Sequence, residues 1–454
     1  MASPLDPSTP PLPPRPDRRT ILGAALAGSA LVAGGSAYAA AISAESFGVR
    51  GDGSERTGAL QQALDAAAAA GRPLALAPGD YPVTGLRLPA GGVLVGPRSA
   101  RLRQASGGPA VSASGVGAAR VVGMTIEGLG AGVGDAPLLS AVDVGDLLVE
   151  DVAFAGAPGP AIRLERSGGR VRGCVVAGAR VGLFSLDATG LAVAENTITD
   201  CLDNGIQIWR SQKGTDGAQV IANRVARIRA ASGGTGENGN GINVFRAGGV
   251  LVADNVISAC DFSAVRNNGG DGIQIVSNRA QDCGEVALFT EFGFEGAVIA
   301  SNLVDGAAHG IVSTNLNEGG RMAAITGNVV RNLFRRPAVE GGQEARSYGI
   351  FAEADAAISG NVIDGVPDEG LRLGWGPYLR NVAATGNVLR ECGVGIVVSV
   401  VEGVGPVLIA SNLITGARRA AILGHRWDET ATGDLAREGA DAWAHLTIAS
   451  NAVG

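Results

Sequence analysis

The sequence predicts an all-β fold, a single-stranded right-handed parallel β-helix (solenoid) with an N-terminal capping helix. Three observations predict it: a recurring asparagine, a Gly-Ile pair midway between asparagines, and a composition with few large side chains. Of the 454 residues, 71 are Gly, 4% are aromatic and 17% are charged, yet 46% are hydrophobic. Such a chain needs many small apolar side chains and tight turns, and it is too apolar for a disordered coil.

The asparagine repeat sets the length of the coils. Six of its nine intervals are 23 to 27 residues long and three are 32 to 39, which we interpret as coils with loop insertions. The ten residues are Asn196, Asn223, Asn255, Asn278, Asn302, Asn328, Asn361, Asn387, Asn412 and Asn451. Two weaker coils come before them, with Asp151 and Cys174 at the asparagine position.

Two properties suit asparagine to a coil corner. It tolerates the left-handed backbone of a sharp turn, and its side-chain amide can bond to the same residue of the next coil. Period-2 alternation and the absence of helical spacing within the repeats disfavour a helical solenoid. Parallel coils joined in this way should be right-handed.

The Gly-Ile pairs mark a second fixed point of each coil, where Gly interrupts the strand and Ile fills the core. They are Gly205-Ile206, Gly241-Ile242, Gly310-Ile311, Gly349-Ile350, Gly370-Leu371 and Gly395-Ile396.

Four cysteines lie five residues after an asparagine, and we expect them to form an inward-facing column of the core. They are Cys201, Cys260, Cys283 and Cys392. Cys260 and Cys283 fall on adjacent coils about 4.8 Å apart, so a disulfide between them is the less favoured alternative. No spacing in the sequence predicts a metal site.

The N-terminal segment predicts export. Arg18-Arg19 precede a short apolar stretch, and Ala37-Tyr38-Ala39 fits a cleavage site, so residues 1–39 are interpreted as a signal peptide. The paired arginines favour a twin-arginine (Tat) signal over an ordinary secretory one. The stretch is too short for a stable membrane span. We therefore expect the Tat export machinery as a partner and a periplasmic or secreted protein of a Gram-negative bacterium.

The rest of the chain divides into a cap and a repeat array. Residues 40–110 should form the N-terminal cap and first coils. A helix from about Thr57 to Ala70 should cover the apolar end of the solenoid. A strand over 73–77 and a turn at Pro78–Tyr81 should follow it. Residues 111–454 should form the β-helix repeats. Loop insertions are expected at 210–217, 230–240, 335–347 and 426–442, the last folding over the final coil or over the groove.

Residues 47–96 resemble the N-terminal module of the pectate-lyase-like superfamily of sugar-active β-helices. The resemblance rests on Phe47-Gly48, Gly51-Asp52-Gly53, the helix and Pro78-Gly79-Asp80-Tyr81, although Ser54-Glu55-Arg56-Thr57 departs from the acidic residues and Thr often found before that helix. With Arg18-Arg19 and the asparagine coils, the whole chain resembles the Tat-translocated repetitive proteins. That resemblance implies β-helix repeats and periplasmic export but no established reaction, so no catalytic residue carries over.

The charge distribution restricts the partners. The net charge is −7, and no Lys/Arg block outside the N-terminus could follow a phosphate backbone, so nucleic acid is not expected. An acidic surface also weighs against polyanionic sugars. The loop at Ser232–Gly239 has phosphate-loop-like glycines but no following Lys or helix, which argues against nucleotide binding. The sequence does not identify a cofactor.

A row of side chains should form the site. After each Gly-Ile pair, alternate residues point outward, and successive coils stack them into a ladder. Its aromatic and amide members suit a polysaccharide and are expected to bind it: Gln207, Trp209, Asn243, Phe245, Phe289, Phe351 and the adjacent Trp375.

The same ladder holds the candidate catalytic residues Glu291, Glu353, Arg266, Arg372 and His309. The two glutamates should lie about 9.6 Å apart, at the edge of the 6.5–9.5 Å of an inverting glycosidase. One would be the general acid and the other would activate water, while the arginines bind uronate or hydroxyl groups. In a lyase, an Arg or Lys would instead take the proton beside a neutralised uronate.

Purely structural roles are the alternative for these residues. Glu291–Arg266 and Glu353–Arg372 could be cross-coil ion pairs worth about 0–1 kcal/mol each, and His309 could cap a strand rather than act as a base. Two functions follow: a hydrolase, lyase or epimerase acting on an unidentified glycan, or a non-catalytic binding or scaffold protein. Catalysis predicts a deep groove with facing glutamates, and binding alone predicts an aromatic strip with glutamates neutralised by arginines.

Overall fold

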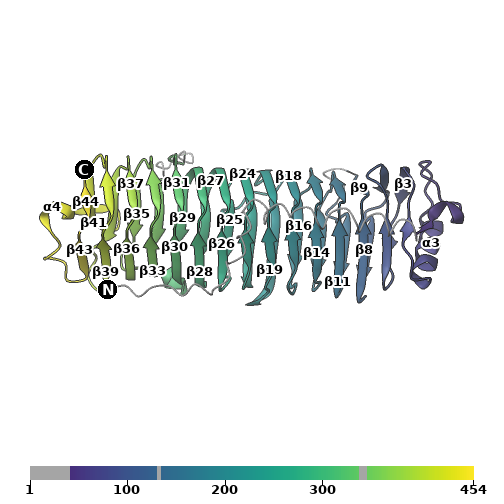
Figure 1. The fold of residues 1–454 in the computed structure, drawn as a ribbon, viewed down its shortest axis with the longest axis horizontal. Helices are drawn as coiled ribbons and strands as arrows, with labels where there is room; N and C mark the ends of the chain where they lie inside the picture. The colour runs from purple at the N-terminus through teal and green to yellow at the C-terminus, as the bar shows by residue number, and fades with distance from the viewer. Residues whose placement is uncertain (1–40, 130–133, 337–344) are drawn as a thin grey trace, which may run out of the picture.

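The computed structural model describes residues 41–129, 134–336 and 345–454, and it confirms the right-handed parallel β-helix. The coils stack along one long axis, and three β-strand faces run the length of the molecule (Figure 1). Among the described strands, every pairing is parallel except that of β41 with β42 and two isolated bridges. Within these ranges the helices are η1 (Ala44–Phe47), α3 (Thr57–Ala69), η2 (Leu316–Glu318) and α4 (Leu435–Glu438).

The first face is a 16-stranded sheet. Its strands are β1 (Ile42–Ser43), β2 (Leu74–Ala75), β5 (Gly92–Val95), β8 (Ala118–Val122), β11 (Asp146–Glu150), β14 (Gly169–Arg172), β17 (Ala192–Ala194), β20 (Gln219–Ile221), β23 (Leu251–Ala253), β26 (Ile273–Val276), β28 (Glu295–Ala300), β30 (Arg321–Thr326), β33 (Ala354–Ser359), β36 (Arg380–Thr385), β39 (Val407–Ala410) and β43 (Leu446–Ala449).

The second face follows the asparagine corner in each coil. Its strands are β3 (Gly79–Val83), β6 (Ala100–Gln104), β9 (Thr125–Glu127), β12 (Ala153–Ala155), β15 (Val175–Ala177), β18 (Thr197–Cys201), β21 (Arg224–Ile228), β24 (Val256–Cys260), the first parts of β27 (Arg279–Glu291) and β29 (Leu303–Ser313), β31 (Val329–Arg331), β34 (Val362–Asp364), β37 (Val388–Arg390), β40 (Leu413–Thr415) and β44 (Ala452–Val453).

The third face carries the predicted ladder and is called the ladder face below. Its strands are β4 (Leu86–Arg87), β7 (Val111–Ser114), β10 (Leu139–Val142), β13 (Pro160–Glu165), β16 (Val181–Leu186), β19 (Asn204–Thr215), β22 (Asn240–Gly248), β25 (Val265–Asn268), the later parts of β27 and β29, β32 (Tyr348–Ala352), β35 (Glu369–Leu373), β38 (Val394–Ser399) and β41 (Ala420–Arg426), with β42 (Glu429–Asp434) folded back on β41.

The asparagines form one continuous column, as predicted. In each step, Nδ2 of one asparagine donates to Oδ1 of the next, as from Asn302 to Asn328 at 2.9 Å, and the same Oδ1 accepts the backbone N–H of the first. Nδ2 also donates to a carbonyl of the preceding coil, here Ile275 O at 2.9 Å. Every polar atom of the buried amide is therefore satisfied along the axis, which explains why this residue recurs.

The prediction that asparagine itself takes the left-handed backbone conformation was wrong. The left-handed φ belongs to the residue before each asparagine, such as Glu195 (59°), Ala222 (57°) and Asp254 (55°). Asp151 has the same conformation (φ 53°), so it matches these preceding residues. Val152 takes the asparagine position in that coil, because Ala153 pairs with Val175. Cys174 does hold the predicted position, since its N–H donates to Asn196 Oδ1 at 3.0 Å.

The Gly-Ile pairs and the cysteines occupy the core as predicted. A Cβ on Gly205 would overlap the Gly241 carbonyl of the next coil, and Ile206 and Ile242 are fully buried. All five cysteines are buried free thiols, and Cys260 lies directly opposite Cys283 without a disulfide.

The N-terminal cap is close to the prediction. Helix α3 covers the end of the solenoid (Figure 1) and buries Leu60, Ala63, Leu64 and Ala67. The turn predicted at Pro78–Tyr81 was wrong, because Gly79 already begins β3. The predicted signal peptide lies outside the described residues, as does most of the predicted 335–347 loop. Within the described ranges, no helix has the length and hydropathy needed to cross a bilayer.

Candidate functional site

The strand register stacks the ladder as the sequence predicts. One outward column runs through consecutive pairings along the ladder face: Phe184, Gln207, Asn243, Arg266, Phe289, Val312, Phe351, Arg372, Val397 and Leu423. A second column begins with Leu186, Trp209, Phe245, Asn268 and Glu291. Side chains far apart in sequence are therefore neighbours along the axis.

The polar members of this ladder are not open to solvent, which the sequence did not predict. Glu291 is 4% exposed, Glu353 6% and Arg372 1%. Inserted segments contact them: Gly236 lies against Arg266, Leu316 against Glu353, and Trp427 against Arg372. Inserted segments thus cover these polar members of the ladder.

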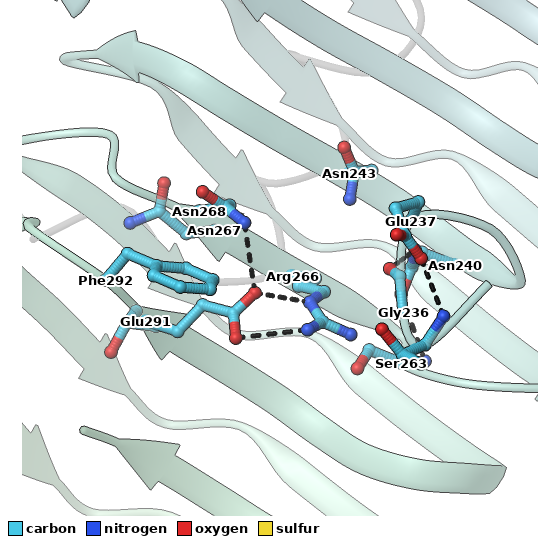
Figure 2. Close-up of polar contacts among 12 residues, drawn as sticks. Gly236, Glu237, Asn240, Asn243, Ser263, Arg266, Asn267, Asn268, Glu291 and Phe292 are labelled. Atoms are coloured by element: carbon cyan, nitrogen blue, oxygen red, sulfur yellow. Dashed lines mark hydrogen bonds and ion pairs between the residues drawn. The ribbon is translucent and has the colours of Figure 1, made fainter. Parts of the chain in front are cut away.

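One pocket of about 250 Å³ opens among three aromatic rings on the ladder face. It is lined by Trp209, Thr235, Gly236, Glu237, Asn243, Phe245, Arg266, Asn268 and Phe292. Figure 2 shows the 236–240 segment on one side of Arg266 and Glu291 with Phe292 on the other. Of the predicted site residues, the fold brings Trp209, Asn243, Phe245 and Arg266 together here.

The aromatic wall of the pocket belongs to a row of rings from successive coils, in edge-on and tilted contact. Trp209 meets Phe184 edge-on at a centroid distance of 5.5 Å, and it meets Phe245 at 5.4 Å. Trp209 Nε1 donates to Asn243 Oδ1 at 2.7 Å, which fixes the indole and the amide together. The predicted binder Gln207 is buried in the outward column beside Asn243 and does not line the pocket.

Arg266 is held by two acids, Glu291 and Glu285, which together bind all three of its guanidinium nitrogens. Its Nε and Nη2 donate to the two oxygens of Glu291 at 2.6 and 3.0 Å, and its Nη1 donates to Glu285 at 3.3 Å. Asn268 also donates to Glu291 at 3.3 Å, and Arg336 donates to Glu285 at 3.2 Å. The predicted ion pair between Glu291 and Arg266 is therefore confirmed, and it is buried.

The Arg266 guanidinium also lies 5.1 Å from the ring of Phe289, which keeps this predicted binder beside the network. The ring does not line the pocket.

Glu353 lies in a different environment. Its Oε2 accepts the Leu316 N–H at 2.7 Å, and burial raises its pKa to about 7. The predicted ion pair with Arg372 was wrong, since Arg372 donates to Glu369 at 3.0 and 3.1 Å. Glu369 directly precedes a Gly-Leu pair, the same position that the candidate His309 has in its own coil, but no role was predicted for it from the sequence.

Arg372 lies at the centre of a second aromatic cluster. Its guanidinium carbon is 5.4 Å from the Tyr348 ring, 5.8 Å from Phe351 and 4.6 Å from Trp375. Trp427 covers this cluster, since its carbonyl accepts from Nη2 of Arg372 at 2.9 Å and its ring packs on Trp375. The predicted binders Phe351 and Trp375 therefore hold Arg372, under the C-terminal insertion.

His309 stacks on Tyr348 with a centroid distance of 5.0 Å and an interplanar angle of 17°. Burial lowers its pKa to about 4, so the imidazole is neutral at pH 7, and its Nδ1 has no hydrogen-bond partner. Its role as a base stays a prediction.

Several pocket residues were missed by the sequence argument. Thr235, Gly236 and Glu237 come from the loop insertion that the sequence predicts at 230–240, but no periodicity predicts the path of that loop. Phe292 follows the last ladder residue of its coil and has a left-handed φ of 58°, which turns its ring back toward the pocket. Among the described residues, no cluster of three His, Cys, Asp or Glu could hold a metal ion.

Solved structures with similar coils come from proteins of several kinds. They include the catalytic unit of a GH87 α-1,3-glucanase of Streptomyces thermodiastaticus (16% identity, 92% of this chain and 69% of that one, TM-score 0.46). The surface adhesin PfbA of Streptococcus pneumoniae has 14% identity over 91% of this chain and 97% of the adhesin, with a TM-score of 0.45. A Family 28 exopolygalacturonase of Yersinia enterocolitica has 11% identity over 91% and 77% of the two chains, with a TM-score of 0.36.

No curated protein sequence matches the chain. Residues 160–333, which contain every residue that lines the pocket, match the family model described as the right handed beta helix region.

Proposed function

We propose that this chain binds a polysaccharide along its ladder face and that the pocket beside Trp209 holds one residue of that polymer. The observation that supports this most is the lining of the pocket: three aromatic rings, the amides of Asn243 and Asn268, and a carboxylate in one concave site. Apolar walls with a few placed polar groups are typical of small-molecule sites. The volume is below the 300–1,000 Å³ typical of drug-sized ligands, which suits a single sugar ring.

Binding without catalysis is favoured by the state of Glu291. Its two oxygens are engaged by Arg266, so neither is free to activate water without breaking a buried ion pair. Glu291 thus meets the expectation for a binding strip with arginine-neutralised glutamates, whereas Glu353 has no such arginine partner among the residues that the structure describes. In this proposal Arg266 and Glu291 support the pocket floor, while Trp209, Phe245 and Phe292 contact the sugar.

The experiment is a glycan array probed with the wild type and the Trp209→Ala variant. The wild type should bind at least one polysaccharide, and Trp209→Ala should weaken that binding by about tenfold or more, because Trp residues dominate interface energies. Phe47→Ala is the control, since Phe47 is an exposed aromatic residue (38%) at the N-terminal cap. No glycan bound by the wild type, or equal binding by Trp209→Ala, contradicts the proposal.

A second candidate, glycoside hydrolysis, is favoured by one observation. A carboxyl group with a pKa of about 7, as in Glu353, is suited to donate a proton to a leaving sugar at neutral pH. Product analysis of any glycan bound on the array tests it. Glu353→Gln and Glu291→Gln should each abolish turnover if the two act as acid and base, and turnover unchanged in both variants rejects that pair.

Export is part of the proposal. Residues 1–39 would act as a Tat-type signal, and the mature protein would lie in the periplasm or outside the cell. Mass spectrometry of the protein from a bacterial host should find an N-terminus just after Ala39. Replacing Arg18 and Arg19 together by Lys should block export, and export that continues through the general secretory pathway contradicts the Tat assignment.

A further inference from the structure

The two charged side chains that line the pocket differ in whether a ligand can pair with them. Its lining contains one cation, Arg266, and one anion, Glu237. All three guanidinium nitrogens of Arg266 donate to Glu285 or Glu291, so its positive charge is already paired with two carboxylates. Glu237 is exposed, and it forms no ion pair with any residue that the structure describes. The charge that the pocket offers to a ligand is therefore negative.

The position of Glu237 is fixed by its loop. Gly236 has a φ of 137° and lies so close to Arg266 that a Cβ there would overlap the guanidinium. Glu237 follows directly, and its Oε2 accepts the Thr235 N–H at 2.7 Å. Its own N–H and that of Thr235 hold the pKa of this carboxyl below its usual value, so the group is ionised at neutral pH.

The walls of the pocket suit the same ligand charge. A cation over the face of Trp, Tyr or Phe is attracted by the ring electrons, by about 0.5–2 kcal/mol depending on desolvation. Trp209, Phe245 and Phe292 line the pocket. Phe245 already has one cation near it, since the guanidinium carbon of Arg246 is 4.6 Å from the ring, but Arg246 does not line the pocket.

We infer that the pocket selects an amino sugar, with Glu237 bound to the protonated amine and the aromatic rings of Trp209, Phe245 and Phe292 around the sugar ring. The ligand class is a glycan with free amino groups, such as a polymer of glucosamine units. Acidic glycans are disfavoured because Arg266 is already neutralised and Glu237 would repel a carboxylate. This inference rests on the proposed glycan binding and adds the substrate class.

Calorimetric titration of the full chain at about pH 6 tests the inference with three oligosaccharides of equal length, made of glucosamine, N-acetylglucosamine or glucose. The wild type should bind the glucosamine oligomer about tenfold tighter than the other two, and this advantage should shrink as salt is raised. Glu237→Gln should remove the advantage, because the glucosamine oligomer then loses the carboxylate that binds its amine. The matched control is Glu195→Gln, which loses the same charge at an exposed turn of the asparagine corner.

The outcomes separate the two proposals. Equal affinity for the three oligomers, or a preference for glucosamine that Glu237→Gln retains, overturns the amino-sugar inference while glycan binding stands. Absence of binding to all three, together with an empty glycan array, overturns both.

Discussion

Arg266 and Glu291 form a bidentate ion pair across adjacent coils, with Nε–Oε1 and Nη2–Oε2 distances of 2.6 and 3.0 Å. Their side chains are 10% and 5% exposed, so the pair has little contact with water. Fork-to-fork geometry of this kind fixes orientation as well as charge. The pair therefore holds the floor of the pocket rigid while Glu237 remains available at its edge.

Breaking this pair should destabilise the protein strongly. Glu291→Met should lower the free energy of unfolding by about 3 kcal/mol or more, because Arg266 would stay buried with less compensation. The double variant Arg266→Met/Glu291→Met should lose less than the sum of the two single variants. Thermal unfolding of the four proteins in a double-mutant cycle measures this coupling. Additive losses would show that the two charges do not stabilise each other.

The asparagine column should be most sensitive in its interior. Asn302→Leu removes the Oδ1 that accepts the backbone N–H and Nδ2 of Asn278, and it takes the Nδ2 donor away from Ile275 O. Asn328 Oδ1 keeps only the backbone N–H of residue 302 as a donor from that residue. Buried groups left unpaired cost about 1–3 kcal/mol each, so the melting temperature should fall by many degrees or the protein should fail to fold.

The control for that substitution lies at the end of the same column. Asn451 is half-exposed and has no asparagine after it, so water can replace the bonds that Asn451→Leu removes. Its melting temperature should fall much less than that of Asn302→Leu. Equal losses at the two positions would contradict a stabilising role for the continuous column.

The loop that carries Glu237 should depend on one glycine. A Cβ at Gly236 would collide with Arg266, and its φ of 137° is strained for any other residue. Gly236→Ala should therefore displace the loop and weaken glycan binding by about tenfold, the factor that a shift near 1.4 kcal/mol produces. Gly233→Ala, in the same loop but with open space around its Cβ, should weaken binding less. Calorimetric titration of the wild type, Gly236→Ala and Gly233→Ala with the glycan that binds most tightly on the array measures this difference in affinity.

Glu353 should make the stability depend on pH. Burial raises its pKa from 4.5 to about 7, so the folded state holds a proton that the unfolded state releases between those values. Stability from this group is present below about pH 4.5 and is lost as the pH rises through 7, by about 3 kcal/mol in total. Glu353→Gln should therefore unfold at a higher temperature than the wild type at pH 8, with the difference shrinking toward pH 5. A difference that is constant with pH would show that Glu353 titrates normally in the folded protein.

The repeat made most of the fold predictable. The spacing of the asparagines and of the Gly-Ile pairs predicted the strand register, so the outward column from Phe184 to Leu423 was placed correctly, including Arg266 before Phe289. The mistakes concerned single positions within a coil. Asp151 was assigned to the asparagine position, which is one residue early. In sequence, a polar residue before a strand looks the same whether it takes the left-handed backbone conformation or bonds to the next coil through its side chain.

The site was less predictable because it depends on segments outside the repeat. The insertion at Ala230–Asn240 places Gly236 and Glu237 over Arg266, and no period in the sequence relates residue 237 to residue 266. Likewise, the sequence put Arg372 next to Glu353 by coil count, whereas Glu369, three residues earlier in the same strand, binds it. Contacts made by loops and between neighbours within one strand could therefore be identified only in the three-dimensional structure.

A crystal structure of the full chain with the best array glycan tests the central claim most directly. The account predicts one sugar ring in the pocket, in contact with Trp209, Phe245 and Phe292, with further units continuing along the ladder face. A glycan bound on either of the other two faces, with the pocket empty, would contradict it.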